Sequence, residues 1–319
     1  MPKTPATDKP SELGVFASIA AGCSLLIAQP LPMIVPVLVD VWLWQGPRVS
    51  PASVAGPLAD ALAIQPGGDT GLADVVLRWG QSGDITAIVG WFAPSLLAGL
   101  DVVPMTGLRP RPAIEMGGPG AMLLALLMIV LAAFVVMIFK TMLARGVQGR
   151  PLLDRAFPAE ALRNGVRYLA YLVLATVAIA VAVVPVAVLL ALAGVMGANL
   201  LPLFGLVASM AVFAGAVLLA FVGEAIALTG AGPWQAVKLS AGVVRDHSSR
   251  TMGLLLVLWV SLVSLPEVLA RLGSNRLGIA LAILIYAFAA TGLEFGRMLF
   301  FHARLPRTSM VKSSPLSAK

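Results

Sequence analysis

Cysteine and histidine are nearly absent from this sequence. Its 319 residues include one cysteine, Cys23, and two histidines, His247 and His302. A single cysteine excludes an internal disulfide and a cluster of thiolate metal ligands, and two histidines leave little for metal or acid–base chemistry. The sequence also lacks the H-E-x-x-H and G-x-S-x-G motifs of metal-dependent and serine hydrolases. We therefore expect no catalytic residues, no metal and no cofactor, and a protein that is not an enzyme.

Charged residues are also scarce. They make up 12% of the chain, whereas 59% of its residues are hydrophobic and its mean hydropathy is +0.94. A soluble domain is roughly half apolar and roughly a quarter charged, and several apolar runs here reach the roughly 20 residues that a membrane-spanning helix needs. We therefore expect an all-α fold, a polytopic transmembrane helix bundle. The net charge of +7 does not indicate nucleic-acid binding, because the basic residues lie beside apolar segments and form no basic domain with interleaved aromatic residues.

The apolar runs predict about six spans in a single membrane domain at 14–304, after a disordered lead at 1–13. The first span, at 31–44, is short and bent by prolines, and the segment 14–28 before it is expected to insert partly or to lie at the membrane interface. The segment 85–100 is too short and broken to cross, so an interfacial or re-entrant piece is expected there. The other five spans are predicted at 121–143, 168–195, 200–228, 252–272 and 277–301.

The charges between the spans predict how the chain is threaded. The segment 47–120 is acidic and is expected to form a helical loop outside the cytoplasm. Two short amphipathic helices are expected within it, at 58–64 and 72–79. The gaps after the second and fourth spans and the tail at 305–319 are basic, and positive charge favours the cytoplasmic side. We expect a bacterial inner-membrane protein with both termini in the cytoplasm and a cytoplasmic surface helix at 233–247.

Six ionisable side chains in or near the predicted spans are candidate site residues: Asp40, Glu224, Glu267, Arg271, Glu294 and Arg297. An unpaired charge in a bilayer costs several kcal/mol, so each one needs a partner or water. The pairs 267/271 and 294/297 are four and three residues apart on a helix and can form local ion pairs. Asp40 and Glu224 have no such neighbour. Glu224 is expected to share Arg297 with Glu294, whereas Lys140 is expected to extend from the end of its span toward the interface.

Two functions fit these residues. Structural pairing or placement near the interface is favoured, because most of the six lie within about two helical turns of a predicted span end, where water is in reach. This favours a non-enzymatic accessory or scaffolding module. The alternative is a small-solute or lipid transporter that uses Asp40 and Glu224. It gains support if both side chains face a water-filled cavity between helices, and loses support if both face headgroups.

The expected partners are the lipid bilayer and either another membrane protein or a second copy of the chain. Small residues recur at four-residue spacing along the fourth predicted span, from Gly205 to Gly223, and allow helices to approach closely. Packing within the chain is favoured over dimerisation as their role. Matching halves are not detectable in the sequence, although inverted repeats would have favoured transport.

Two segments resemble bacterial membrane proteins. The first consists of Gln29-Pro30, Pro36, Asp40, Trp42-Leu43-Trp44, Gly46-Pro47-Arg48 and Ser50. It resembles the opening of a group of uncharacterised polytopic proteins, in which an amphipathic lead ends at a proline before a P-x-x-x-D span. The second consists of Glu224-Ala225, Gly232-Pro233, Ala236, Ser240 and Arg245. It is similar to the joint between a span and a surface helix in the membrane domain attached to some glycerophosphodiester phosphodiesterases. The resemblance implies a six-helix membrane module of unassigned role. It does not imply phosphodiesterase activity, because the catalytic barrel is not in this sequence.

Overall fold

The computed structural model describes residues 14–63, 70–98, 113–195 and 201–305. Within these ranges the chain is almost entirely helical, which confirms the expected all-α fold class. The predicted disordered lead at 1–13 and nearly all of the predicted tail lie outside the described ranges.

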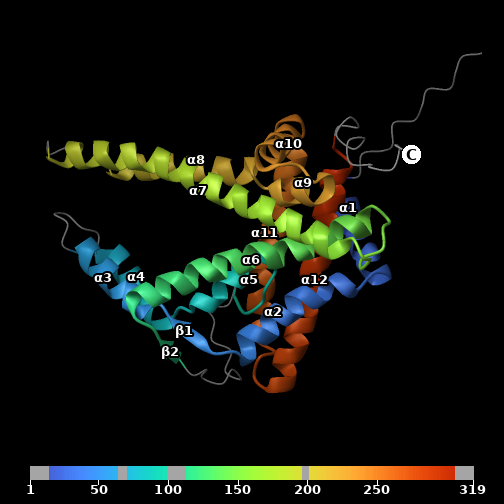
Figure 1. The fold of residues 1–319 in the computed structure, drawn as a ribbon, viewed down its shortest axis with the longest axis horizontal. Helices are drawn as coiled ribbons and strands as arrows, with labels where there is room; N and C mark the ends of the chain where they lie inside the picture. The colour runs from blue at the N-terminus through green and yellow to red at the C-terminus, as the bar shows by residue number, and fades with distance from the viewer. Residues whose placement is uncertain (1–13, 64–69, 99–112, 196–200, 306–319) are drawn as a thin grey trace, which may run out of the picture.

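Figure 1 labels the elements in chain order, and η marks a 3-10 helix. The first part of the chain forms α1 (Val15–Ala28), η1 (Leu31–Met33), α2 (Ile34–Gln45), β1 (Arg48–Ser50), α3 (Ala52–Ala63), α4 (Thr70–Ser82), η2 (Ile85–Ala87), α5 (Ile88–Phe92) and β2 (Ala113–Glu115). The second part forms α6 (Gly118–Val147), α7 (Phe157–Val195), α8 (Leu201–Leu218), α9 (Val222–Thr229), α10 (Pro233–Asp246), α11 (Ser248–Ala270) and α12 (Arg276–His302).

Among the described residues, five helices are long and apolar enough to cross a membrane, and there are six spans if a bent pair counts as one. The five are Gly118–Val147, Phe157–Pro185, Gly205–Thr229, Ser248–Ala270 and Arg276–His302, which overlap the predicted second to sixth spans. The bent pair is Val15–Ala28 with Leu31–Gln45, which meet at 91°. Gln29 leaves the helical conformation, with φ −139° and ψ 75°, because Pro30 disfavours helical dihedrals in the residue before it. The predicted first span is therefore the second arm of a broken helix.

The segment between the broken helix and α6 contains the two expected short helices, α3 and α4, and also a two-stranded parallel sheet that was not expected. Asp84 joins β1 to η2, because its Oδ1 accepts hydrogen bonds from the backbone N–H groups of Val49 at 3.1 Å and Thr86 at 2.9 Å. The chain then forms only the five-residue helix α5 and a turn. The expected break in the segment 85–100 is therefore present.

The predicted surface helix is present as α10, and one face of it is buried. Its buried residues are Ala236, Ser240, Val243 and Val244, whereas Trp234 is 63% exposed. The hydroxyl of Ser240 donates a hydrogen bond to the Leu218 carbonyl at 2.7 Å and accepts one from the Phe221 N–H at 3.1 Å. These two groups flank the break between α8 and α9. Ser240 therefore satisfies two backbone groups at the break, and this need determines which face of α10 packs inward.

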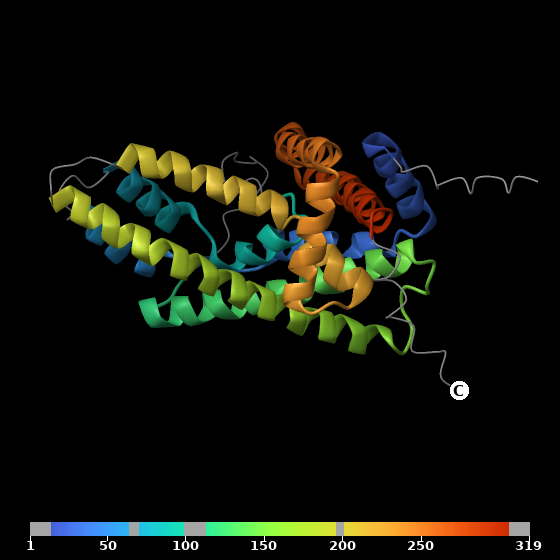
Figure 2. The same cartoon turned by 90° about the horizontal axis from the view of Figure 1, so that it is seen from above.

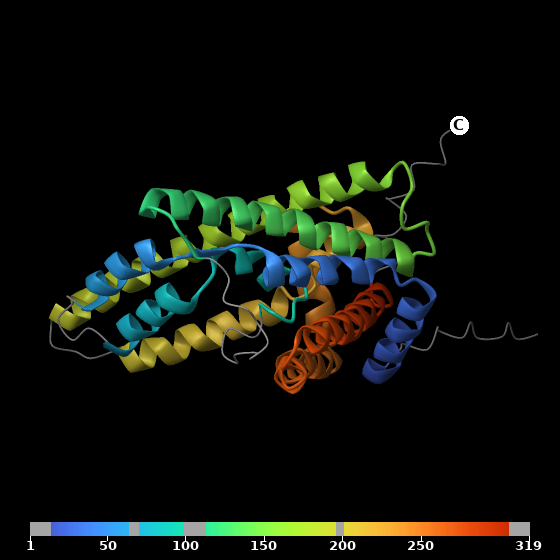
Figure 3. The same ribbon diagram turned by 90° about the horizontal axis from the view of Figure 1, so that it is seen from below.

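The long helices run in two main directions. α7 and α8 extend together away from the rest of the molecule (Figures 1 and 2), and their outer parts are exposed, with Val181 at 68% and Val212 at 71%. α1 and α12 lie side by side at the other end, and α12 is steeply inclined to α7 and α8 (Figures 1 and 3). The main core lies where α6, α9 and α12 meet, and there Phe221 stacks on Phe301 with ring centroids 5.2 Å apart.

Glycines set the distance between α1 and α12. A Cβ added at Gly22 would lie 2.3 Å from the backbone nitrogen of Gly296, and one added at Gly296 would lie 2.8 Å from the Cα of Ile19. Gly292 faces Cys23 in the same contact, with 3.0 Å between an added Cβ and the cysteine sulfur. Small residues permit this close approach between membrane helices. Cys23 contributes to it as a small packing residue.

We predict that Gly296→Ala destabilises the protein by about 1–3 kcal/mol, because the atoms nearest the new methyl group belong to the α1 backbone and cannot rotate away. Gly215→Ala in α8 is the matched control, since nothing lies within 4 Å of a Cβ added there. Thermal unfolding in detergent should give a lower Tm for the first variant and an unchanged or higher Tm for the second. Equal Tm values for Gly296→Ala and the parent protein would contradict this packing.

Candidate functional site

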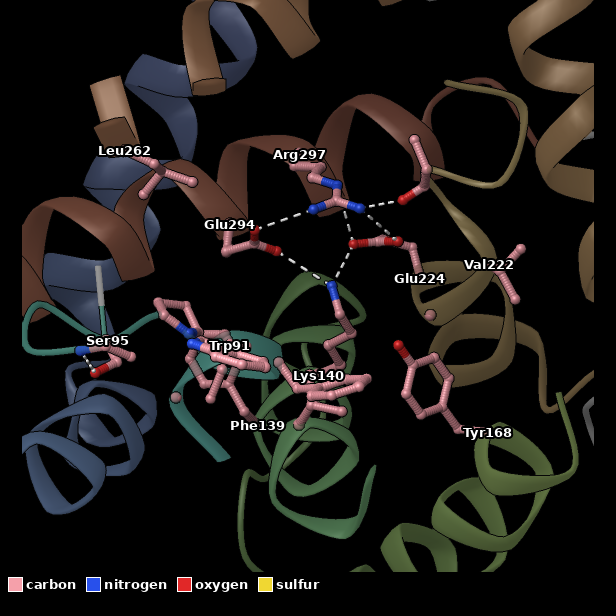
Figure 4. A pocket seen from close by; sticks show the side chains of 18 of the residues that line it. Trp91, Ser95, Phe139, Lys140, Tyr168, Val222, Glu224, Leu262, Glu294 and Arg297 are labelled. Atoms are coloured by element: carbon pink, nitrogen blue, oxygen red, sulfur yellow. Dashed lines mark hydrogen bonds and ion pairs between the residues drawn. The ribbon is translucent and has the colours of Figure 1, made fainter. Parts of the chain in front are cut away.

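Four charged side chains meet inside the molecule, where α6, α9 and α12 come together (Figure 4). We call Lys140, Glu224, Glu294 and Arg297 the charge cluster. The Nζ atom of Lys140 lies 2.5 Å from Glu224 Oε1 and 3.2 Å from Glu294 Oε2. Arg297 bridges the same two carboxylates, with Nε 3.2 Å from Glu224 Oε1 and Nη1 3.1 Å from Glu294 Oε1. Each cation therefore contacts both acids.

The local structure of each helix places these groups. Glu294 and Arg297 are three residues apart on α12 and so lie on one face. Glu224 is in the first turn of α9, directly after the break from α8. That break frees the Ala220 carbonyl, which accepts a hydrogen bond from Arg297 Nη2. Gly223 leaves room for Lys140, because a Cβ at that position would lie 2.9 Å from the lysine Cδ.

The cluster is buried and its charges balance. Glu224 is 0% exposed, Glu294 7% and Lys140 8%. Two cations and two carboxylates leave no net charge. A balanced arrangement of this kind is how ionisable groups are tolerated away from water.

A cavity of about 460 Å³ lies beside the cluster and is lined by all four of its members (Figure 4). Its other walls come from the α5 turn, α6, the start of α7, the α8–α9 break, α11 and α12. Aromatic rings are frequent in these walls, with Trp91 and Phe139 among them. All three tyrosines of the chain also line the cavity: Tyr168, Tyr171 and Tyr286.

Three polar groups of these aromatic side chains have no hydrogen-bond partner within the described structure. The hydroxyls of Tyr168 and Tyr286 and the indole N–H of Trp91 make no hydrogen bond there. Tyr286 is nevertheless only 4% exposed, and in Figure 4 the hydroxyl of Tyr168 points toward the charge cluster. Buried polar groups are normally satisfied by the protein or by a bound molecule. These hydroxyls are therefore available to a guest in the cavity.

Asp40 is fully buried but does not line the cavity. Its Oδ1 accepts hydrogen bonds from the Ser95 hydroxyl at 2.6 Å and the Leu97 N–H at 3.0 Å, and its Oδ2 accepts one from the Leu96 N–H at 3.0 Å. The turn held in this way includes Ser95, which does line the cavity. Asp40 thus positions the turn after α5 and supports the cavity wall from behind.

This arrangement overturns the expectation for Lys140 and decides two points that the sequence left open, the pairing of Glu267 with Arg271 and the placement of Asp40. Lys140 does not extend from the end of its span, because α6 continues to Val147 and the lysine is buried in the cluster. Glu267 and Arg271 are both exposed at the end of α11, and no ion pair joins them within the described residues. Asp40 does not lie in the cavity, although Glu224 does. The expected sharing of Arg297 by Glu224 and Glu294 is confirmed.

Arg145 is another buried cation, and the sequence did not single it out. It is fully buried near the end of α6 and contacts Asp154 at 2.8 Å and Glu160 at 2.7 Å. The guanidinium hydrogen-bonds to the Asp154 carboxylate and lowers its pKa below the usual range. Arg145 therefore anchors the loop between α6 and α7.

No protein-family model, curated protein or solved structure matches this chain. The resemblance to the membrane domain attached to glycerophosphodiester phosphodiesterases therefore stays a prediction. The geometry of the cavity and its charges is what bears on function.

We predict that Arg297→Gln lowers stability by about 3–5 kcal/mol, because it leaves the cluster with two buried carboxylates and a single cation. Arg271→Gln is the matched control, since Arg271 is exposed and forms no ion pair within the described structure. Thermal unfolding of both purified variants in one detergent measures the difference, which should be a clear loss of Tm for the first and almost none for the second. An unchanged Tm for Arg297→Gln would mean that the cluster does not hold the helices together.

Proposed function

We propose that this chain is a multi-pass protein of a bacterial inner membrane, with six spans and both termini in the cytoplasm. Five helices of sufficient length and apolarity and the broken pair α1–α2 support the number of spans. The basic gaps after α6 and α9 and the acidic segment before α6 support the orientation. The inner membrane is proposed because its spans are helical, whereas proteins of the outer membrane are typically barrels.

Labelling of single cysteines tests the orientation. In a Cys23→Ser background, Gln81→Cys reports on the segment before α6, and Arg155→Cys reports on the loop after it; both positions are exposed. A membrane-impermeant maleimide added to intact cells should label Gln81→Cys, whereas Arg155→Cys should react only after lysis. The reverse result would invert the proposed threading.

We further propose that the protein is a transporter for a small solute or a lipid, with the charge cluster as its binding site. The observation that carries this proposal is the cavity of about 460 Å³ that is lined by all four residues of the charge cluster and by three tyrosines. Its volume is within the range of small-molecule sites, and ionisable groups inside membrane segments commonly mark substrate pathways. Glu224 is the acid proposed to act in transport, while Asp40 acts by positioning the turn that forms one wall.

An accessory or scaffolding role is the second candidate, and α8 supports it. Gly205 and Gly215 were expected to pack inside the chain, but nothing lies within 4 Å of a Cβ added at either position. Small residues on an open, apolar helix suit contact with another membrane helix. Only Gly223, at the other end of the series, packs inside the chain, against Lys140.

A pair of cysteine variants on one helix separates the two functions. In the Cys23→Ser background, Leu262→Cys lies in the cavity wall on α11, and Leu256→Cys lies on the exposed apolar surface of the same helix. A transporter exposes its cavity to water, so a charged methanethiosulfonate should react with the first variant in right-side-out and in inverted vesicles. The second variant should stay unreactive in lipid. No reaction of Leu262→Cys from either side would contradict transport and favour the scaffold.

A further inference from the structure

We infer that the ligand of this cavity is a zwitterion, a molecule that carries one ammonium group and one oxyanion group and has no net charge. The inference rests on the proposed binding function and adds the chemical class of the ligand. It follows from the charge balance of the cluster, from the hydrogen-bonding groups that the cluster leaves unused, and from the aromatic walls of the cavity.

The charge balance disfavours a ligand with a net charge. Lys140 and Arg297 neutralise Glu224 and Glu294, and three of the four residues are less than one-tenth exposed. An added anion or cation would leave one charge without a counterpart in a poorly solvated site, which is costly. A zwitterion adds both signs together, so the balance is kept while each of its ends gains an opposite charge.

The cavity has free groups for an oxyanion. The ammonium group of Lys140 has three N–H bonds, of which two point to Glu224 and Glu294. The hydroxyls of Tyr168 and Tyr286 and the indole N–H of Trp91 have no partner in the described structure. Tyr286 is more than nine-tenths buried and still lines the cavity. Neutral donors that line one cavity together with an ammonium group are a suitable set for a carboxylate or a phosphodiester.

The cavity also has groups for an ammonium. Each carboxylate of the cluster keeps unused lone pairs beyond its contacts with Lys140 and Arg297. Trp91 and Phe139 present ring systems in the same cavity (Figure 4), and the faces of aromatic rings attract cations. The protein already uses this contact next to the cavity, because the guanidinium of Arg297 lies 5.7 Å from the ring centroid of Phe221.

A zwitterion of this kind can be a soluble molecule or the headgroup of a lipid, and the test distinguishes the two. Glycerophosphoethanolamine and γ-aminobutyrate are soluble zwitterions, and phosphatidylethanolamine is the first of these with two acyl chains on its glycerol. Ethanolamine and dimethyl phosphate each carry only one of the two charges. Phosphatidylglycerol has similar chains but a net negative headgroup. Binding of the soluble probes to the full-length protein in detergent is measured by thermal shift and titration calorimetry, and retention of the lipids by native mass spectrometry.

The expected result is that a zwitterionic probe binds at least tenfold more tightly than either half molecule, or that phosphatidylethanolamine is retained over phosphatidylglycerol. Tyr286→Phe and Tyr168→Phe, which each remove one hydroxyl, should weaken this binding by about tenfold, as expected for the loss of a hydrogen bond to a charged group. Trp91→Phe should act in the same direction. Trp259→Phe is its control, since Trp259 is 64% exposed on α11 and does not line the cavity.

Other outcomes would contradict the inference. They would not decide the proposed transport function, which is tested separately by the labelling of Leu262→Cys. Equal binding of dimethyl phosphate or phosphatidylglycerol, lost in the tyrosine variants, would identify an anion site. Failure of every probe, while Leu262→Cys still reacts from both sides of the membrane, would mean an accessible cavity for a ligand of another class. Zwitterion binding that none of the cavity variants alters would place the ligand outside the cavity and also contradict the inference.

Discussion

The ion-pair network of Lys140, Glu224, Glu294 and Arg297 is the interaction on which the arrangement of helices depends. It joins α6, α9 and α12, which are far apart in the sequence: Lys140 and Glu294 are separated by 154 positions. In a bilayer the apolar surface of one helix is no better a partner for another helix than lipid is. Packing and polar contacts must therefore determine which helices lie next to one another. A network in which each cation contacts two carboxylates strongly favours one arrangement of the three helices. The close contact of α1 with α12 then extends the assembly through glycine packing.

The break between α8 and α9 is the structural feature that makes the network possible. A continuous helix would use the Ala220 carbonyl for its own hydrogen bonding, whereas the break leaves it free for Arg297. Ser240 of α10 satisfies two further backbone groups at the break, the Leu218 carbonyl and the Phe221 N–H. The surface helix therefore contributes to the site without touching the charges. A broken helix inside a membrane domain is tolerated where the protein satisfies its backbone, and such breaks often border binding sites.

Local features of the fold could be predicted from the sequence, and long-range ones could not. Apolar runs reveal helices directly, and the pair Glu294–Arg297 follows from its spacing on one helix. Lys140 was misplaced because a lysine near the end of an apolar run usually reaches the interface. The structure shows why the lysine stays inside: α6 continues past Arg145, and Gly223 beside Glu224 provides space for a long side chain. Glu267 and Arg271 show that spacing alone does not establish an ion pair. Both residues are exposed, and they are not paired in the described structure.

Asp40 shows why an isolated buried acid does not identify a binding site by itself. Sequence reasoning grouped it with Glu224, because neither has a charged neighbour along its helix. The carboxylate of Asp40 is satisfied by a hydroxyl and two backbone N–H groups of a single turn, so its role is complete without a ligand. The charge cluster differs in this respect. Well-packed hydrophobic residues can replace a buried ion-pair network with little loss of stability, so stability alone does not explain four charges beside a cavity that also holds unpaired tyrosine hydroxyls. A molecule that uses both the charges and the hydroxyls gives one physical reason for their common location.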